Sequence, residues 1–118
     1  MVVTLVTREL SPGITAITFT GRLVLGNRLT EVEHAIRERI RQGSRKLVLD
    51  FTGVDFIDSA GVGALAVCVG SMEREGGTIV VTGATGRVKK LLELTNLHRI
   101  MEMYADVTSG HSALGGKA

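Results

Sequence analysis

Two short runs near the N-terminus mix apolar and polar residues on either side of a turn signal. The runs cover residues 4–9 and 14–19, and Ser11-Pro12-Gly13 lies between them. Partial alternation with a period of two, together with β-branched residues, is typical of strands that expose one face. Proline and glycine at the junction are typical of a tight turn. The pattern therefore predicts an antiparallel hairpin.

A helical pattern follows the hairpin, with apolar residues on one stripe and charged residues on the other face. The charged face includes Glu33 and Arg37 at i, i+4, a spacing that usually marks a solvated surface. We expect Asn27 or Thr30 to cap the start of this helix and Gly43 to close its end. The apolar stripe consists of Leu29, Val32, Ile36 and Ile40.

The middle of the chain contains a short apolar run and then a longer apolar segment without proline. Residues 47–49 read Leu-Val-Leu, which is expected of a strand buried on both faces. Residues 50–59 are expected to form a loop with hydrophobic anchors. Residues 60–75 are apolar around most of a helical circumference, so the second helix should be largely covered.

The last third of the chain predicts one further strand and helix before the pattern weakens. After Gly76-Gly77 we expect a strand over 78–82, a helix over 87–97 and a short strand over 100–104. The whole chain, residues 1–118, is predicted to be a single α/β domain with a mixed sheet of about four to five strands. Its helices should pack mainly on one side, and residues 107–118 should be a weakly structured C-terminal end.

Composition narrows the classes of protein that fit this pattern. Of 118 residues, 44% are hydrophobic and only 3% aromatic, so the core must be built from aliphatic side chains. The net charge is +2 and the charges are interleaved, so no concentrated phosphate-binding field is expected and nucleic acid is an unfavoured partner. No run of about 18 apolar residues occurs, which gives no support to secretion or membrane insertion. A cytoplasmic location is expected.

Cysteine and histidine give no support to a metal or cofactor site. The single cysteine, Cys68, cannot form an internal disulfide, and its apolar surroundings predict a buried, inert thiol. The three histidines, His34, His98 and His111, are scattered, with no i, i+4 pair and no neighbouring cysteine. We therefore expect no metal and no cofactor.

The segment Asp58-Ser59-Ala60-Gly61-Val62-Gly63 stands between the predicted buried strand and the apolar helix. Ser59 occupies the expected N-cap position, where its hydroxyl can accept a hydrogen bond from the first helical turn. Serine at such a position is most often purely structural. From these residues alone, Ser59 is only a helix cap.

The spacing of residues in this region does not match the catalytic motifs of known enzyme classes. A serine hydrolase elbow requires glycine two residues before the serine, where this chain has Ile57. Residues 83–90 contain glycine and basic residues but do not match the phosphate-binding loop of nucleotide hydrolases. The carboxylates of Asp50, Asp55 and Asp58 could form an acid–base pair, but loop ordering is the more common role. No enzymatic activity is expected.

Residues 54–65, which read VDFIDSAGVGAL, resemble the signature of the STAS family, in which Asp-Ser-Ser/Ala-Gly-Leu/Val-Gly carries a phosphorylatable serine. Residues 20–23 resemble the family's Gly-x-Leu loop, residues 76–79 its Gly-Gly turn, and residues 88–97 its third helix. The similarity covers nearly the whole chain. Because the sequence shows no transporter segment, we expect the bacterial anti-sigma factor antagonists to be the branch that it resembles.

The resemblance implies a partner switch that controls transcription. An anti-sigma factor with serine kinase activity would bind the unphosphorylated protein and release its sigma factor, and phosphorylation of Ser59 would end the complex. A serine phosphatase would restore the first state. The alternative is a STAS subunit of a lipid-transport or stressosome assembly. The residues implied to contact the partner are Asp58, Ala60, Gly61, Arg22 and Asn27.

One position departs from the family pattern. Many antagonists carry aspartate directly after the Gly-x-Leu motif, whereas this chain has Val24, flanked by Leu23 and Leu25. Asn27 or Arg22 could supply the polar side of the site instead, although either could also be an ordinary loop residue. The departure bears on how well Ser59 is phosphorylated and by which kinase.

Overall fold

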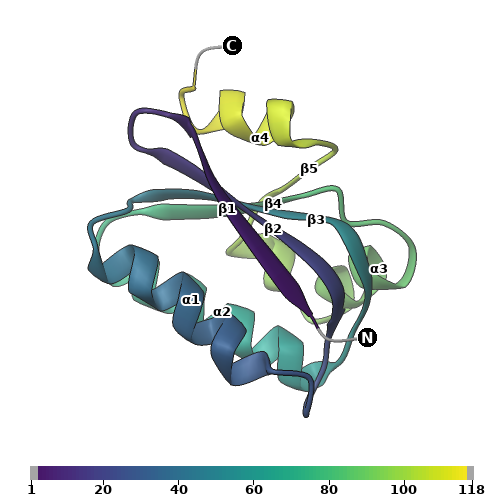
Figure 1. The fold of residues 1–118 in the computed structure, drawn as a ribbon. Helices are drawn as coiled ribbons and strands as arrows, with labels where there is room; N and C mark the ends of the chain where they lie inside the picture. The colour runs from purple at the N-terminus through teal and green to yellow at the C-terminus, as the bar shows by residue number, and fades with distance from the viewer. Residues whose placement is uncertain (1–2, 117–118) are drawn as a thin grey trace.

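Five strands form one mixed sheet in the order β1-β2-β3-β4-β5 (Figure 1). The computed structural model describes residues 3–116. β1 and β2 form the predicted antiparallel hairpin, and β2 to β5 run parallel to one another. The strands are β1 (Thr4–Ser11), β2 (Ile14–Leu23), β3 (Lys46–Ile57), β4 (Thr78–Thr82) and β5 (Met103–Tyr104).

Three helices cover one face of the sheet, and a fourth lies on the opposite face (Figure 1). The three are α1 (Leu29–Arg41), α2 (Ser59–Arg74) and α3 (Gly86–Leu94), and the fourth is α4 (Val107–Ala113). A short 3-10 helix, η1 (Leu97–Arg99), links α3 to the last strand. The predicted fold class is confirmed: a mixed α/β sheet with helices mainly on one side.

The main core lies between the sheet and the three helices. It consists almost entirely of aliphatic side chains, with Phe19 and Phe51 in edge-to-face contact at a centroid distance of 5.6 Å. On α1 the buried residues are Val32, Ile36 and Ile40, which confirms the predicted apolar stripe. A smaller cluster on the other face of the sheet packs under α4.

The prediction of a loop over residues 50–59 was wrong for most of its length. β3 continues to Ile57 and stays paired with β2, while β4 ends at Thr82. The β2–β3 register shifts at two places, between Thr18 and Thr20 and between Gly21 and Arg22. Such irregularities break the alternation of buried and exposed residues by which a strand is recognised in sequence.

Of the two predicted ends of α1, the start differs from the structure and the closure by Gly43 agrees with it. α1 is capped neither by Asn27 nor by Thr30: its N-cap is Arg28, in a left-handed conformation with φ 60°, and its side chain pairs with Glu31. At its other end Gly43 follows the last turn with φ +106°, a value that favours glycine.

The C-terminal end is more ordered than the sequence predicts as far as residue 116. Residues 107–113 form α4, because Asp106 caps its first turn and Leu114 is buried against the second core cluster. His111 also hydrogen-bonds the Ser11 hydroxyl at 2.8 Å, which ties the helix to the hairpin turn. Residues 117 and 118 lie outside the described residues.

Candidate functional site

Ser59 is the first residue of α2, and its side chain is exposed. The prediction that Ser59 is the N-cap was wrong. The N-cap is Asp58, whose backbone is extended and whose Oδ1 accepts from the Gly61 N–H at 2.9 Å. Aspartate and serine are comparably good caps, and the chain enters the helix one residue earlier than expected. The Ser59 hydroxyl is therefore not used in capping.

The cap residue also reaches a second segment of the chain. Oδ2 of Asp58 accepts from the Leu25 N–H at 3.0 Å, and the Asp58 N–H donates to the Leu23 carbonyl at 3.3 Å. These bonds fasten the β2–α1 loop to the start of α2. The loop and the helix start form one surface around Ser59.

Gly61 is buried, and its role in the monomer is close packing. A Cβ placed there would lie 2.2 Å from the Leu23 carbonyl oxygen and 2.7 Å from Cγ1 of Ile57. The first turn of α2 can sit against β2 only because residue 61 has no side chain. Gly61 thus shapes the surface on which Ser59 lies.

The other residues implied by the resemblance lie on α2, at the end of β2 and in the β2–α1 connection. Ala60 is half-buried on α2, and Arg22 is exposed at the end of β2, paired with Phe56 of β3. The side-chain amide of Asn27 donates to the Arg22 carbonyl at 2.8 Å, within the β2–α1 connection. Val24, which stands in place of the family's aspartate, is half-buried.

A shallow groove of about 550 Å³ lies directly beside this helix start, between the β2–α1 connection and α2. Its lining includes small residues of α2, and a Cβ on Gly63 would meet nothing within 4 Å. Leu25 and Val67 at its borders are 78% and 45% exposed. We call it the switch groove; its lining is Leu25, Gly26, Arg28, Leu29, Thr30, Glu33, Ala60, Gly63, Ala64 and Val67.

Sequence reasoning missed the apolar part of this surface. Leu25 lies exposed in the β2–α1 connection, and Val67 lies on the exposed side of a helix that was expected to be largely covered. A signal for Leu25 was present: the apolar run Leu23-Val24-Leu25 continues past the end of the strand into the turn.

A cleft of about 600 Å³ lies between α1 and the C-terminal part of α2, but most of its charged residues pair among themselves. Arg37 pairs with Glu33 at 3.7 Å, and Arg45 with Glu75 at 3.1 Å. These exposed pairs agree with a solvated helix face, as the i, i+4 spacing predicts.

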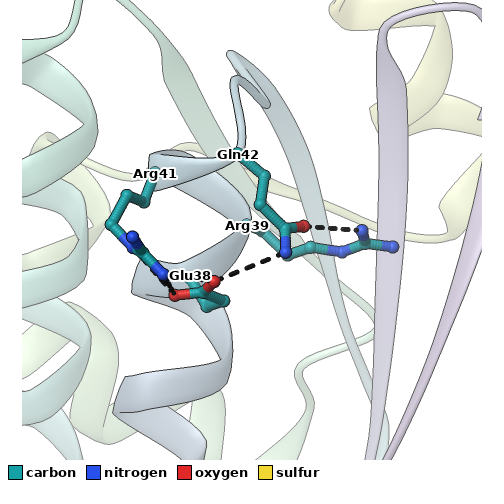
Figure 2. A network of polar contacts seen from close by, with 4 residues as sticks. All are labelled: Glu38, Arg39, Arg41 and Gln42. Atoms are coloured by element: carbon teal, nitrogen blue, oxygen red, sulfur yellow. Dashed lines mark hydrogen bonds and ion pairs between the residues drawn. The ribbon is translucent and has the colours of Figure 1, made fainter.

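The polar network at the end of α1 has the same character. Figure 2 shows Glu38 accepting from Arg41 at 2.6 Å and from Gln42 at 3.4 Å, with Arg39 donating to Gln42. The hydrogen bond from Arg41 lowers the pKa of Glu38, and the same bond raises the pKa of Arg41. Such exposed networks are satisfied within the monomer and point to no ligand.

Reactive groups outside the helix start are few. Cys68 is buried, and loss of hydration raises the pKa of its thiol to about 12, so the expected inert thiol agrees with its surroundings. Among residues 3–116, no group of His, Cys, Asp and Glu side chains is arranged to hold a metal ion. No helix in the same range has the length and apolar character needed to cross a membrane.

The mixed sheet and its helices match a known family of α/β domains. The STAS domain model matches residues 6–110, which is most of the chain. The chain therefore belongs to the STAS domain family, and the resemblance predicted from residues 54–65 is confirmed.

Its relatives include proteins named for the control of sigma factors. A Thermotoga neapolitana protein named as an anti-sigma factor antagonist homologue is 28% identical over 80 residues, which cover 68% of this chain and 71% of that protein. An anti-sigma factor antagonist from Mycobacterium paratuberculosis has the same fold, with a TM-score of 0.85 and 20% identity over 96% of this chain and 94% of that one.

The fold is also shared with the Bacillus cell fate determinant SpoIIAA, whose structure is known in a phosphorylated form. That structure matches with a TM-score of 0.72 and 17% identity, over 93% of this chain and 99% of the other. The likeness at this level of identity concerns the fold.

Proposed function

We propose that this protein is an anti-sigma factor antagonist, a binding module without catalytic activity of its own that is released from its partner by phosphorylation of Ser59. The observation that carries the proposal is the exposed Ser59 side chain at the first residue of α2, directly beside the apolar switch groove. A kinase can reach this hydroxyl. A partner that fills the groove would lie against it.

The proposed partner is an anti-sigma factor with serine kinase activity. Its binding to the unphosphorylated protein would free the sigma factor, which places the switch in the cytoplasm, where transcription occurs. The names of the relatives support this class of partner. The proposed contact surface comprises Leu25, Val67, Asp58, Ala60, Arg22 and Asn27, with Gly61 shaping the helix start.

The chemical step is phosphoryl transfer from ATP. The Ser59 Oγ forms a bond to the γ-phosphorus, the bond between that phosphorus and the bridging oxygen breaks, ADP leaves, and the hydroxyl proton passes to a base of the kinase. A serine phosphatase would reverse the state by hydrolysis, with water supplying the oxygen of the released inorganic phosphate. The antagonist contributes only the acceptor hydroxyl.

Phosphorylation should change binding more than folding. The N–H groups of Ser59 and Ala60 have no hydrogen-bond partner among residues 3–116, so the helix start can accommodate phosphate oxygens. A group carrying roughly −1.5 to −2 charges would, however, have to be desolvated beneath a closely packed partner. The larger part of the energetic penalty therefore arises in the complex.

Two substitutions at Ser59 test the switch. Ser59→Asp should lower the affinity for the anti-sigma factor about tenfold or more, which is about 1.4 kcal/mol. Ser59→Ala should bind like the wild type and acquire no phosphate. Because Asp58 and not Ser59 caps α2, Ser59→Ala should change the free energy of unfolding by less than about 0.5 kcal/mol. Titration calorimetry and thermal melts measure both quantities.

The matched control is Ser112→Asp, which adds the same charge at an exposed position near the end of α4 and should leave affinity unchanged. Phosphosite mapping after incubation with the anti-sigma factor and ATP completes the test. Equal affinity of wild type and Ser59→Asp, with no phosphate on Ser59, would reduce Ser59 to an ordinary helix residue.

A further inference from the structure

The carboxylate of Asp58 joins two segments that lie 33 residues apart in the sequence. One oxygen accepts from the Gly61 N–H in α2 at 2.9 Å, and the other accepts from the Leu25 N–H in the β2–α1 loop at 3.0 Å. Leu25, whose side chain is 78% exposed, borders the switch groove. Asp58, the residue next to Ser59, thus holds the backbone of Leu25, whose exposed side chain belongs to the same surface.

Two further hydrogen bonds of this loop are local. The Asn27 N–H donates to the Val24 carbonyl at 3.1 Å, and the Asn27 side chain donates to the Arg22 carbonyl at 2.8 Å. These bonds define the turn but do not fasten it to α2. Its Leu25 end is fastened there by Asp58.

We propose that Asp58 is a positioning residue that couples the phosphorylation state of Ser59 to the position of Leu25 on the partner-binding surface. The coupling rests on the proposed function, because it assumes that Ser59 is phosphorylated and that the switch groove receives the partner. It adds a second route to release: the phosphate alters the surface itself, besides obstructing the partner.

Electrostatics gives the direction of the effect. A phosphate on Ser59 places roughly −1.5 to −2 charges on the residue next to the carboxylate of Asp58, and like charges at this distance repel. The phosphate oxygens also compete for the N–H groups of the first turn of α2, including that of Gly61. Asp58 is then displaced from both of its donors, and the Leu25 N–H is released to water.

The Leu25 amide reports this coupling without any partner. We would introduce phosphoserine at position 59 during translation of the full chain and measure amide hydrogen exchange by NMR. Exchange at Leu25 should be about tenfold faster in the phosphorylated protein, as expected for the loss of a hydrogen bond to a charged group. Continued protection of Leu25 would overturn the coupling.

Asp58→Asn separates positioning from capping. Asparagine is an equally good N-cap, but when its amide oxygen accepts from the Gly61 N–H, its NH2 group, which can only donate, takes the place of the oxygen that accepts from the Leu25 N–H. With that oxygen retained on Gly61, Leu25 exchange should rise about tenfold in the unphosphorylated variant while Gly61 exchange stays within about twofold of wild type. Phosphorylation of this variant should add less than about twofold at Leu25, because the two changes remove the same bond.

Asp55→Asn is the matched control. It removes a carboxylate three residues away on β3, exposed and without a side-chain hydrogen bond to the described residues, and should leave Leu25 unchanged. An equal effect of Asp55→Asn and Asp58→Asn would overturn the proposal, since charge alone would then be responsible.

The coupling and the proposed function can fail separately. A phosphorylated protein that loses affinity for the anti-sigma factor while Leu25 stays protected would overturn the coupling and leave the function standing. If the phosphorylated protein shows faster exchange at Leu25 but unchanged affinity for the anti-sigma factor, the coupling within the monomer is supported and the proposed function is overturned.

Discussion

Helices α2 and α4 begin in the same way, yet among the described residues only the capping carboxylate of α2 also accepts a hydrogen bond from another segment. Each is capped by an aspartate whose Oδ1 accepts from the N–H three residues later, at 2.9 Å from Asp58 to Gly61 and 2.8 Å from Asp106 to Ser109. The same Oδ1 of Asp106 also accepts from the Ser109 hydroxyl at 2.7 Å, within its own helix. The second oxygen of Asp58 reaches Leu25, in another segment.

The difference shows how a common capping device becomes part of a functional surface. A local cap stabilises one helix, whereas a cap with a second acceptor oxygen directed outward fixes the relative position of two segments. The same first turn carries Ser59 beside the bridging residue. The start of α2 therefore combines a modifiable hydroxyl with the bond that arranges its surroundings.

The largest expected difference between the two regions concerns glycine. Gly61→Ala would place a Cβ 2.2 Å from the backbone oxygen of Leu23, which cannot move without displacing β2, whereas Gly110→Ala would meet the Cγ2 of Thr82 at 2.6 Å. We expect Gly61→Ala to lower the free energy of unfolding by about 3 kcal/mol and Gly110→Ala by about 1 kcal/mol. Urea unfolding of both variants measures this.

A larger residue at position 61 sharpens the same test. Gly61→Leu should prevent stable folding or displace the loop that carries Leu25, so its effect on partner binding follows from the fold. A folded Gly61→Leu variant with normal affinity would remove this position from the proposed surface. If Gly61→Ala and Gly110→Ala lower the free energy of unfolding equally, the two helix starts tolerate an added side chain equally well, which would contradict this prediction.

The next effect concerns the caps themselves. Asp58→Ala removes the bond to Gly61 and the bond to Leu25, so it should cost about 2 kcal/mol, the upper part of the range for N-cap substitutions. Asp106→Ala should cost less, because its contacts are confined to a short, exposed helix start. Thermal melts rank the two variants. The reverse order would contradict the view that Asp58 bridges two elements.

Much of the fold could be predicted from sequence because its signals are local. The hairpin, the stripe of α1 and the apolar α2 each follow from periodicity over a few turns or residues. The extension of β3 to Ile57 could not be predicted from the sequence. Its buried residues Phe51, Val54 and Ile57 are three residues apart where the register with β2 shifts, and a strand is recognised in sequence by a spacing of two.

In the candidate site, too, features with a local sequence signal could be predicted and long-range contacts could not. Ser59 could be found through the signature of residues 54–65, but Asp58 and Ser59 are both good caps and adjacent, so the sequence alone does not decide which one caps α2. The bond from Leu25 to Asp58 depends on the β2–β3 pairing, which brings the end of each strand to the same edge. No local pattern predicts such a contact.

The smallest expected effect is a pH dependence at α4 that sharpens the contrast with α2. The hydrogen bond from the Ser109 hydroxyl, followed by that from its N–H, lowers the pKa of Asp106 from the ordinary 3.8. A lowered pKa in the folded state means that the cap stabilises the protein fully above the unfolded-state value and that this contribution is lost as the pH falls through the folded-state pKa. The stability difference between wild type and Asp106→Asn should therefore shrink below about pH 4. Thermal melts across this pH range measure the stability difference, and an NMR titration of Ser109→Ala, in which the pKa of Asp106 should rise, tests its cause. If the stability difference between wild type and Asp106→Asn persists unchanged at low pH, the ionised carboxylate is not what stabilises the start of α4.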